Sequence, residues 1–328
     1  MRRREFVALF GAAAALPVAA RAQQRDGTRV IGVLMGFAES DPGAQSMVAA
    51  FRNALPKLGW MEGATCASNF GWGGYDADRI KALAKELVDL RPDAILGQST
   101  PVIAALARET RATPIVFVLV TDPIGSGFIA SLAHPGGNMT GFMVDDSDLG
   151  GKWLELLKEV APRIARVSLL FNPAGPPLHF FMPSIQAAAL SFDVQLNVTT
   201  IHAKDELDGV ISAQARDPVG GLIVLPNVFN NTNLELIISL AARYRVPAVY
   251  FTAYCAQSGG LIAYGPDYAE EARQAAEYVD RILKGAKPGD LPIQAPTKFE
   301  LVVNLKAAKA LGIDIPSSMQ LLAHEVIE

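Results

Sequence analysis

Polar residues follow the apolar runs of this 328-residue chain at several points, and one of these places offers a carboxylate. The apolar run 115–120 is followed by Thr121, Asp122 and Pro123. Such a run predicts a strand buried on both faces of a parallel sheet. In open α/β sheets small molecules bind beyond the carboxyl ends of the strands, so Asp122 is placed to accept an ammonium group. The alternative is a turn in which Asp122 bonds to its own backbone.

Ser99 and Thr100 offer the opposite chemistry. They stand just before Pro101, at the start of a helix predicted over 98–110. Their hydroxyls and free backbone N–H groups suit a carboxylate, to which the helix dipole contributes about 0.3–1 kcal/mol. Together with Asp122 they would hold a zwitterion. An ordinary helix N-cap is the alternative for this pair.

Aromatic residues just beyond predicted strands could enclose the apolar part of the same molecule; they are Phe37, Trp72, Tyr75, Phe229 and Tyr254. A micromolar Kd requires about −8.2 kcal/mol in total, so burial of apolar area has to add to the contacts at the two charged ends. The alternative for each ring is ordinary core packing.

Catalytic motifs are absent from the sequence. The four histidines, His134, His179, His202 and His324, show neither H-x-x-x-H spacing nor a neighbouring nucleophile elbow. No G-x-G-x-x-G follows the first predicted strand, and no phosphate loop is found. We therefore expect no metal and no cofactor. An exported α/β enzyme acting on a small molecule stays as the alternative function.

The elements that position these residues are predicted by hydrophobic periodicity, which alternates between strand and helix along the whole chain. Consecutive βα units of this kind imply parallel sheets with helices on both faces, hence an α/β fold of Rossmann-like lobes. The predicted strands are 30–35, 65–70, 94–97, 115–120, 139–144, 167–171, 194–201, 221–225, 248–251, 261–264 and 299–303. The predicted helices are 45–58, 77–90, 98–110, 150–160, 182–190, 205–215, 234–244, 268–283 and 305–311.

Two lobes account for this series, because the second half of the pattern repeats the plan of the first. A further helix and strand after two complete lobes are best explained if the chain returns to the first lobe and then crosses again. We predict a first lobe of 28–145 plus 265–290 and a second lobe of 146–264 plus 291–328. Three crossings of this kind make a hinge.

Residues 1–22 have the features of an export signal. Arg2, Arg3 and Arg4 precede a small apolar run and an A-x-A cleavage site, which places the mature amino terminus near Gln23. The Arg3-Arg4 pair resembles the twin-arginine pattern. The apolar run is shorter than the roughly 20 residues that span a bilayer. We expect a soluble protein in the periplasm.

The overall charge of −4 and the absence of a basic cluster after the first few residues argue against a nucleic acid partner. The two cysteines, Cys66 and Cys255, fall in different predicted lobes. Two separate buried thiols are expected, and a disulfide in the oxidising compartment is the alternative.

Six segments together resemble the ABC-transporter substrate-binding family that includes tryptophan and tyrosine binders. They are GQSTP at 97–101, TDPIGSG at 121–127, HPGGNMTG at 134–141, GGLIVLP at 220–226, YGPD at 264–267 and QAPTKFELVVNLK at 294–306. The resemblance covers the whole mature chain and implies a type I periplasmic binding protein architecture, with one solute held between lobes that close about the hinge.

For the site, the resemblance implies strand-end residues, here Ser99, Thr100, Asp122, Asn172, Asn227 and Tyr254. Many relatives carry Asp where Asn227 stands. The partners implied are a small organic solute, with an aromatic or apolar amino acid as the best guess, and the transmembrane subunits of an ABC permease, through which alone the protein would contact the membrane. A regulator with the same bilobal fold would need a DNA-binding headpiece, and the export signal occupies that place.

Overall fold

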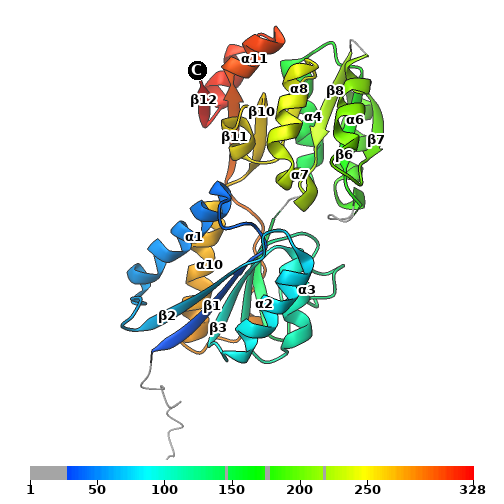
Figure 1. Cartoon of the computed structure of the whole chain (residues 1–328). Coiled ribbons are helices and arrows are strands. Elements are labelled where there is room, and N and C mark those ends of the chain that lie inside the picture. The colour runs from blue at the N-terminus through cyan, green and yellow to red at the C-terminus, as the bar shows by residue number, and fades with distance from the viewer. Residues whose placement is uncertain (1–27, 145–146, 174–177, 217–218) are drawn as a thin grey trace, which may run out of the picture.

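The computed structural model describes residues 28–144, 147–173, 178–216 and 219–328. These residues form two lobes, each a β-sheet covered by helices, which lie one above the other in Figure 1. The predicted α/β class and the two-lobed architecture are confirmed. The export signal predicted at residues 1–22 lies outside the described residues.

The first lobe has a five-stranded parallel sheet in the order β2-β1-β3-β4-β5. Its strands are β1 (Arg29–Met35), β2 (Cys66–Trp72), β3 (Ala94–Gln98), β4 (Ile115–Val120) and β5 (Met139–Met143). In the pairing of β1, Met35 lies opposite both Trp72 and Gln98, so these strands end at one edge. That edge faces the second lobe (Figure 1).

Helices cover both faces of the first sheet. On one face α1 (Pro42–Ala54), followed by the 3₁₀ turn η1 (Leu55–Leu58), packs against α10 (Tyr268–Leu283). On the other face lie α2 (Ala77–Asp89) and α3 (Thr100–Glu109). Asp76 is the N-cap of α2, because its carboxylate accepts the backbone N–H groups of Asp78 and Arg79 at 2.9 Å.

The second lobe has a seven-stranded sheet in the order β12-β11-β10-β9-β8-β6-β7, in which only the β10–β11 pair is antiparallel. The antiparallel pair arises because β11 follows the third crossing between the lobes. The strands are β6 (Arg166–Phe171), β7 (Gln195–Thr200), β8 (Gly220–Val224), β9 (Ala248–Tyr250), β10 (Ile262–Pro266), β11 (Phe299–Asn304) and β12 (Glu325–Ile327).

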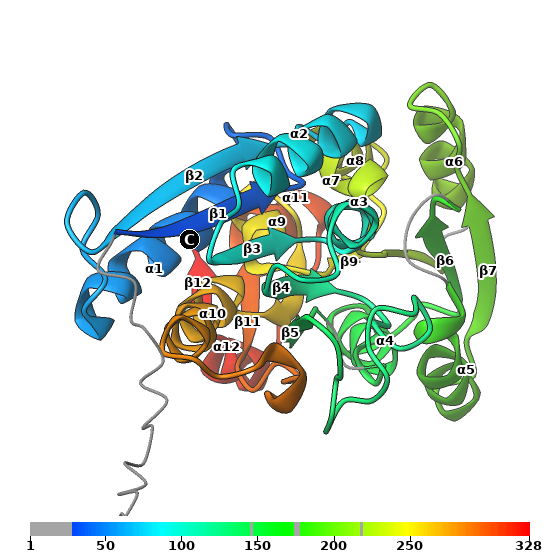
Figure 2. The same ribbon diagram turned by 90° about the horizontal axis from the view of Figure 1, so that it is seen from below.

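Helices also sandwich the second sheet (Figure 2). In that view α4 (Leu149–Val160) and α5 (Met182–Ser191) pack together on one side, while α6 (Glu206–Ala215) and α8 (Leu234–Arg243) pack on the other. The remaining elements are short: the 3₁₀ turn η2 (Leu178–Phe180), α7 (Val228–Thr232), α9 (Ala253–Gln257), α11 (Leu305–Leu311) and α12 (Ser317–Leu322).

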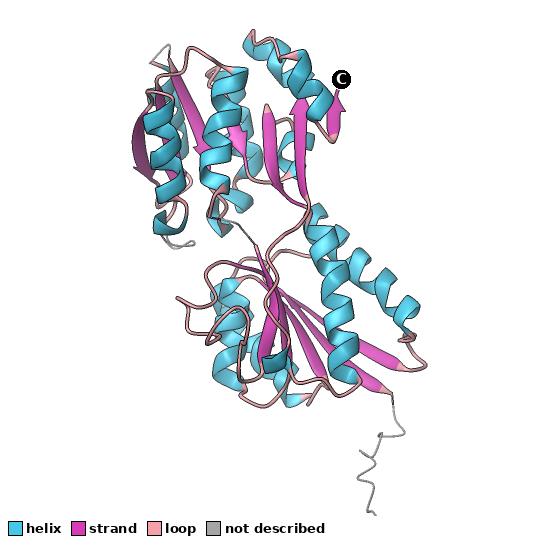
Figure 3. Ribbon diagram, turned by 180° about the vertical axis from the view of Figure 1, so that it is seen from behind, coloured by secondary structure: helices cyan, strands magenta, loops and turns pink. Residues whose placement is uncertain are grey.

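Three crossings join the lobes, as predicted, and Figure 3 shows the second and third running side by side at the waist of the molecule. The second and third are bonded to each other, since Asp267 N donates to Lys298 O at 3.0 Å. The third also pairs with β5, where Met143 N donates to Gln294 O at 2.9 Å. The second and third crossings and the end of β5 are therefore hydrogen-bonded to one another at the hinge.

The residues near the second and third crossings suggest slightly different lobe boundaries from those expected from the sequence. Gly265 and Pro266 belong to β10 in the second sheet, whereas Leu291 and Ile293, which follow the 3₁₀ turn η3 (Pro288–Asp290), pack in the cores of the first lobe. We propose 28–144 plus 267–295 for the first lobe and 147–266 plus 298–328 for the second.

Both cysteines are buried free thiols, as expected from the sequence. Cys66 begins β2 in the first lobe and Cys255 lies in α9 in the second. Because they occupy separate cores, the alternative of a disulfide between them is excluded in this structure.

Candidate ligand site between the lobes

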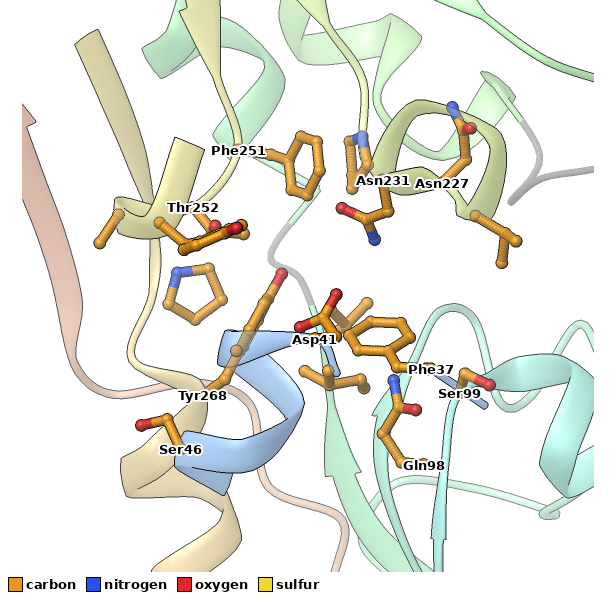
Figure 4. Close-up of a pocket in the computed structure, with 18 of the residues that line it drawn as sticks. Phe37, Asp41, Ser46, Gln98, Ser99, Asn227, Asn231, Phe251, Thr252 and Tyr268 are labelled. Atoms are coloured by element: carbon orange, nitrogen blue, oxygen red, sulfur yellow. The ribbon is translucent and has the colours of Figure 1, made fainter. Parts of the chain in front are cut away.

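A cavity of about 430 Å³ opens between the lobes, where strands of both sheets end. Figure 4 shows side chains from both lobes facing it. The main lining residues are Phe37, Asp41, Gln98, Ser99, Thr100 and Leu119 from the first lobe, Asn227, Asn231, Phe251, Thr252, Tyr254 and Gln257 from the second, and Asp267, Tyr268 and Glu300 at the hinge.

The start of α3 presents hydrogen-bond donors to this cavity. Ser99 has the left-handed φ of 86° that non-glycine residues rarely adopt, and its side chain caps no helical N–H group. The Thr100 hydroxyl accepts Thr121 N at 3.3 Å, which leaves its own hydrogen to donate. Hydroxyls and the positive end of the helix dipole together suit an anionic group.

Asp41 supplies a carboxylate on the same lobe. Its Oδ1 accepts Ala44 N at 2.9 Å and so caps α1, while its Oδ2 accepts the Tyr75 hydroxyl at 2.7 Å. Burial, and then the neighbouring Asp41, raise the pKa of Tyr75 far above its usual range, so the tyrosine stays a donor at physiological pH. The Tyr75 ring packs against Phe37 with centroids 5.2 Å apart.

The second lobe contributes an apolar wall with polar edges. Phe251 is 2% exposed and lies across the cavity from Phe37 (Figure 4). Next to it, Thr252 begins α9 and Tyr254 lies in its first turn. The two phenyl rings, one from each lobe, can enclose an apolar or aromatic group.

The hinge closes one side of the cavity with acidic residues. Asp267 caps α10 through Glu270 N at 3.0 Å and pairs with Lys298 Nζ at 2.7 Å. Glu300 lies 3.6 Å from the same ammonium group. Among the described residues that line the cavity there is no Lys, Arg or His. An anionic ligand without a positive charge is therefore disfavoured.

Five of the residues predicted for the site line the cavity: Phe37, Ser99, Thr100, Asn227 and Tyr254. Asn227 is committed to local structure, because its Oδ1 accepts Asn230 N at 2.8 Å and its Nδ2 donates to Leu225 O at 3.2 Å. It shapes the wall by holding the start of α7.

The other five predicted residues are not among those that line the cavity: Asp122, Asn172, Trp72, Tyr75 and Phe229. Asp122 has φ 44°, and its Oδ1 accepts Gly125 N at 2.8 Å, so the turn alternative describes it. Asn172 is 7% exposed and donates to Ile201 O at 2.9 Å, which ties the ends of β6 and β7 together. Trp72 packs against the first-lobe core from the outermost strand, β2.

Sequence reasoning missed other lining residues, chiefly Asp41, Gln98, Asn231, Thr252 and Tyr268. A usable signal existed for Asp41, which precedes Pro42 as Thr100 precedes Pro101. An Asp before a proline at a helix start is a typical N-cap, and here the start of the helix lies at the cavity.

Within the described part of the chain, no group of three or more His, Cys, Asp or Glu side chains is arranged to hold a metal ion. None of the helices in those ranges has the length and apolar composition needed to cross a membrane.

The fold and the interlobe cavity define a two-lobed small-molecule binding protein. The family model of the ABC transporter substrate binding proteins matches residues 33–327, and the chain belongs to this family. It is thus the substrate-binding component of an ABC transporter.

Individual relatives agree with this assignment. A tyrosine-binding protein of Clostridioides difficile (strain R20291) is 26% identical over 275 residues, which is 83% of this chain and 78% of that protein. A conserved domain protein of Vibrio cholerae is 26% identical with a TM-score of 0.84, covering 92% of this chain and all of the other. A Streptococcus pneumoniae domain in complex with L-Trp shares the fold at 24% identity, with the same TM-score and coverage.

Proposed function

We propose that this protein captures an aromatic or apolar amino acid outside the cytoplasm and delivers it to the permease of an ABC importer. The observation that carries the proposal is the cavity itself, where donors at the start of α3, the Asp41 carboxylate and two facing phenyl rings surround one space. The similarity to a tyrosine-binding protein supports the same ligand class.

In this proposal the ligand carboxylate binds at Ser99 and Thr100, and its ammonium group binds Asp41, which takes the role that the sequence suggested for Asp122. Charge-assisted hydrogen bonds of this type contribute about 1.5–3 kcal/mol each. The side chain of the ligand lies between Phe37 and Phe251, where burial of apolar area contributes about 25 cal/mol per Å².

Ligand binding is coupled to closure of the lobes. The proposed contacts come from both lobes, so the closed form binds the ligand more tightly than the open form. This difference in affinity shifts the population toward closure about the hinge. The permease then distinguishes the loaded, closed protein from the empty one.

Export precedes these steps in our proposal, because an import receptor has to meet its solute outside the cytoplasm. Replacing Arg3 and Arg4 by Lys is expected to retain the protein in the cytoplasm if the twin-arginine pattern directs it. Cell fractionation with an antibody to the mature chain measures this, and unchanged export would contradict the twin-arginine route while leaving the binding function intact.

The ligand class is tested by a thermal-shift panel on residues 23–328, with amino acids, their decarboxylated amines, the matching acids without an amino group, nucleosides and sugars. A ligand at about 100 times its Kd should stabilise the fold by roughly 2.7 kcal/mol. We expect L-tyrosine or L-tryptophan to stabilise the protein more than the amine or the acid alone. A nucleoside or a sugar as the sole stabilising compound would contradict the amino acid assignment.

A further inference from the structure

Gln98, the last residue of β3, has a hydrogen-bonding group that nothing in the described structure satisfies. Its side chain lines the cavity and is 0% exposed. Gln98 Oε1 accepts Gly36 N at 2.9 Å in a buried hydrogen bond, but Nε2 has no partner among the described residues. A buried amide donor without an acceptor destabilises the empty protein, so a partner supplied by a ligand would be favoured.

The direction of this donor is fixed. If the amide were rotated by 180°, its NH₂ group would face the N–H of Gly36, and two donors would oppose each other. The observed orientation therefore holds, and Figure 4 shows Nε2 directed toward the Phe37 ring and the cavity. Gln98 is thus a preoriented donor at the floor of the site.

The neighbours of this donor indicate what it binds. Ser99 and Thr100 follow it directly, and the first turn of α3 has no side-chain cap. Three consecutive residues with amide and hydroxyl donors thus line the cavity, and no basic side chain is found among the described lining residues. A carboxylate, with up to four acceptor positions, fits such a group of neutral donors better than a single hydroxyl or carbonyl.

We propose that Gln98 is a specificity-determining residue whose Nε2 donates a hydrogen bond to the carboxylate of the ligand. This inference rests on the proposed amino acid binding and extends it to a residue that selects for the acid group. Phe37 is half-buried and its ring lies next to the amide in the structure, so the carboxylate reaches Nε2 only if this ring moves aside. Gln98 and Phe37 together admit a ligand that carries both an acid group and an apolar side chain.

The test compares the wild-type protein with Gln98→Glu, using as probes L-tyrosine and tyramine, and L-tryptophan and tryptamine. Glu keeps an oxygen for Gly36 N but replaces the donor by a second acceptor. We expect Gln98→Glu to weaken binding of the amino acid at least 10-fold in calorimetric titration and to weaken binding of its amine less than 3-fold. Equal losses for both probes would overturn the proposal, since they would reflect general damage to the cavity.

The matched control is Gln214→Glu. Unlike Gln98, Gln214 is hydrogen-bonded on both sides of its amide, since its Oε1 accepts Ser168 Oγ at 2.7 Å and its Nε2 donates to Gly221 O at 3.1 Å, and it lies on α6 away from the cavity. Gln214→Glu should bind both the amino acids and their amines with the affinities of the wild type. If Gln98→Glu fails to fold, Gln98→Met, which removes the donor at similar volume, is titrated instead with the same expected selectivity for loss of the amino acid.

The outcomes separate the two proposals. A wild-type protein that binds neither amino acid overturns the proposed ligand class, and the role of Gln98 with it. A wild-type protein that binds an amino acid, with a Gln98→Glu or Gln98→Met variant that binds it equally well, overturns the role of Gln98 alone.

Discussion

At the level of single residues, the cavity wall carries three carboxylates that differ in their partners. Asp267 pairs with Lys298 Nζ at 2.7 Å, and Glu300 lies 3.6 Å from the same group. Asp41, by contrast, receives only neutral donors among the described residues, the Tyr75 hydroxyl and Ala44 N. Its charge is therefore the one that a ligand ammonium group can balance.

Asp41→Asn should weaken amino acid binding by about 1.5–3 kcal/mol, roughly 10- to 150-fold, because the ammonium group loses its charged acceptor. The Asn oxygen still caps α1, so thermal stability should change little. Isothermal titration of both proteins measures the effect. Asp122→Asn, which removes a carboxylate outside the cavity lining, should bind like the wild type, and a larger loss there than at Asp41 would reverse the assignment.

Cys255 should resist alkylation in the native protein. Burial raises its pKa to about 12, so at pH 8 the thiolate that reacts with iodoacetamide is nearly absent. An unfolded thiol has a pKa of about 8.5, so the folded state holds the Cys255 proton more tightly than the unfolded state does. The stability that this difference contributes is fully present below about pH 8.5 and is lost as the pH rises toward 12. Mass spectrometry should find Cys255 labelled by iodoacetamide in urea but not in buffer at pH 8. Rapid labelling in buffer would contradict the expectation, because it would show that solvent reaches the core of the second lobe.

At the level of elements, the buried strands and the longer helices could be predicted, whereas several short elements could not. The strand Ile115–Val120 and the helix Tyr268–Leu283 have the predicted bounds, because continuous apolar or 3.6-residue patterns determine them. α7, α9, α12 and β12 span three to six residues and were missed, because they are too short to show a period.

The positions of side chains beyond strand ends depend on backbone detail that a pattern does not contain. Asp122 follows a strand whose pairing with β5 shifts between Phe117 and Val120, where Leu119 adopts φ 55°. This irregularity puts Leu119 in the cavity wall and leaves Asp122 bonded to its own turn. The sequence predicted the edge of the sheet that forms the site, and Ser99 and Thr100 on it, but only the fold shows Asp41 and Gln98 facing the same space.

The loop between β1 and α1 should control the geometry of the α3 start. A Cβ added at Gly36 would lie 2.5 Å from Ser99 Oγ and 3.3 Å from Val102 Cγ2. Gly36→Ala is therefore expected to displace the Ser99 hydroxyl and weaken binding of the amino acid by about 1 kcal/mol, the value of a typical hydrogen bond. Titration with the amino acid measures this, and binding of its amine should be unaffected.

Gly209→Ala is the control for this substitution. Gly209 lies in α6 with nothing within 4 Å of an added Cβ, so Ala should raise stability by roughly 0.5–1 kcal/mol without any change in ligand binding. If the Gly36→Ala protein binds the amino acid as tightly as the Gly209→Ala protein does, the Ser99 hydroxyl makes no contact with the ligand.

At the level of the whole molecule, the two lobes have separate cores and touch the same cavity from opposite sides. One core cluster belongs to the second lobe and two flank the first sheet, so each lobe can move as a unit. The link between them is the hinge, in which Asp267 and Lys298 join two crossings by a backbone bond and an ion pair. Such an arrangement allows rotation of the lobes with little change within either.

Ligand should therefore slow amide hydrogen exchange in both lobes at once. The start of α3 belongs to the first lobe and the segment from Phe251 to Tyr254 to the second, and both line the cavity. If the ligand drives closure, saturating L-tyrosine or L-tryptophan slows exchange at both places and reduces the radius of gyration in solution scattering. Burial of apolar area on closure should also give a negative heat capacity change in titrations at several temperatures. Asp41→Asn at the same ligand concentration serves as the control, because its weaker binding should leave the cavity mostly unoccupied. Slowed exchange confined to the first lobe, with an unchanged radius of gyration, would show that the ligand binds one lobe only and would contradict closure as the signal to the permease.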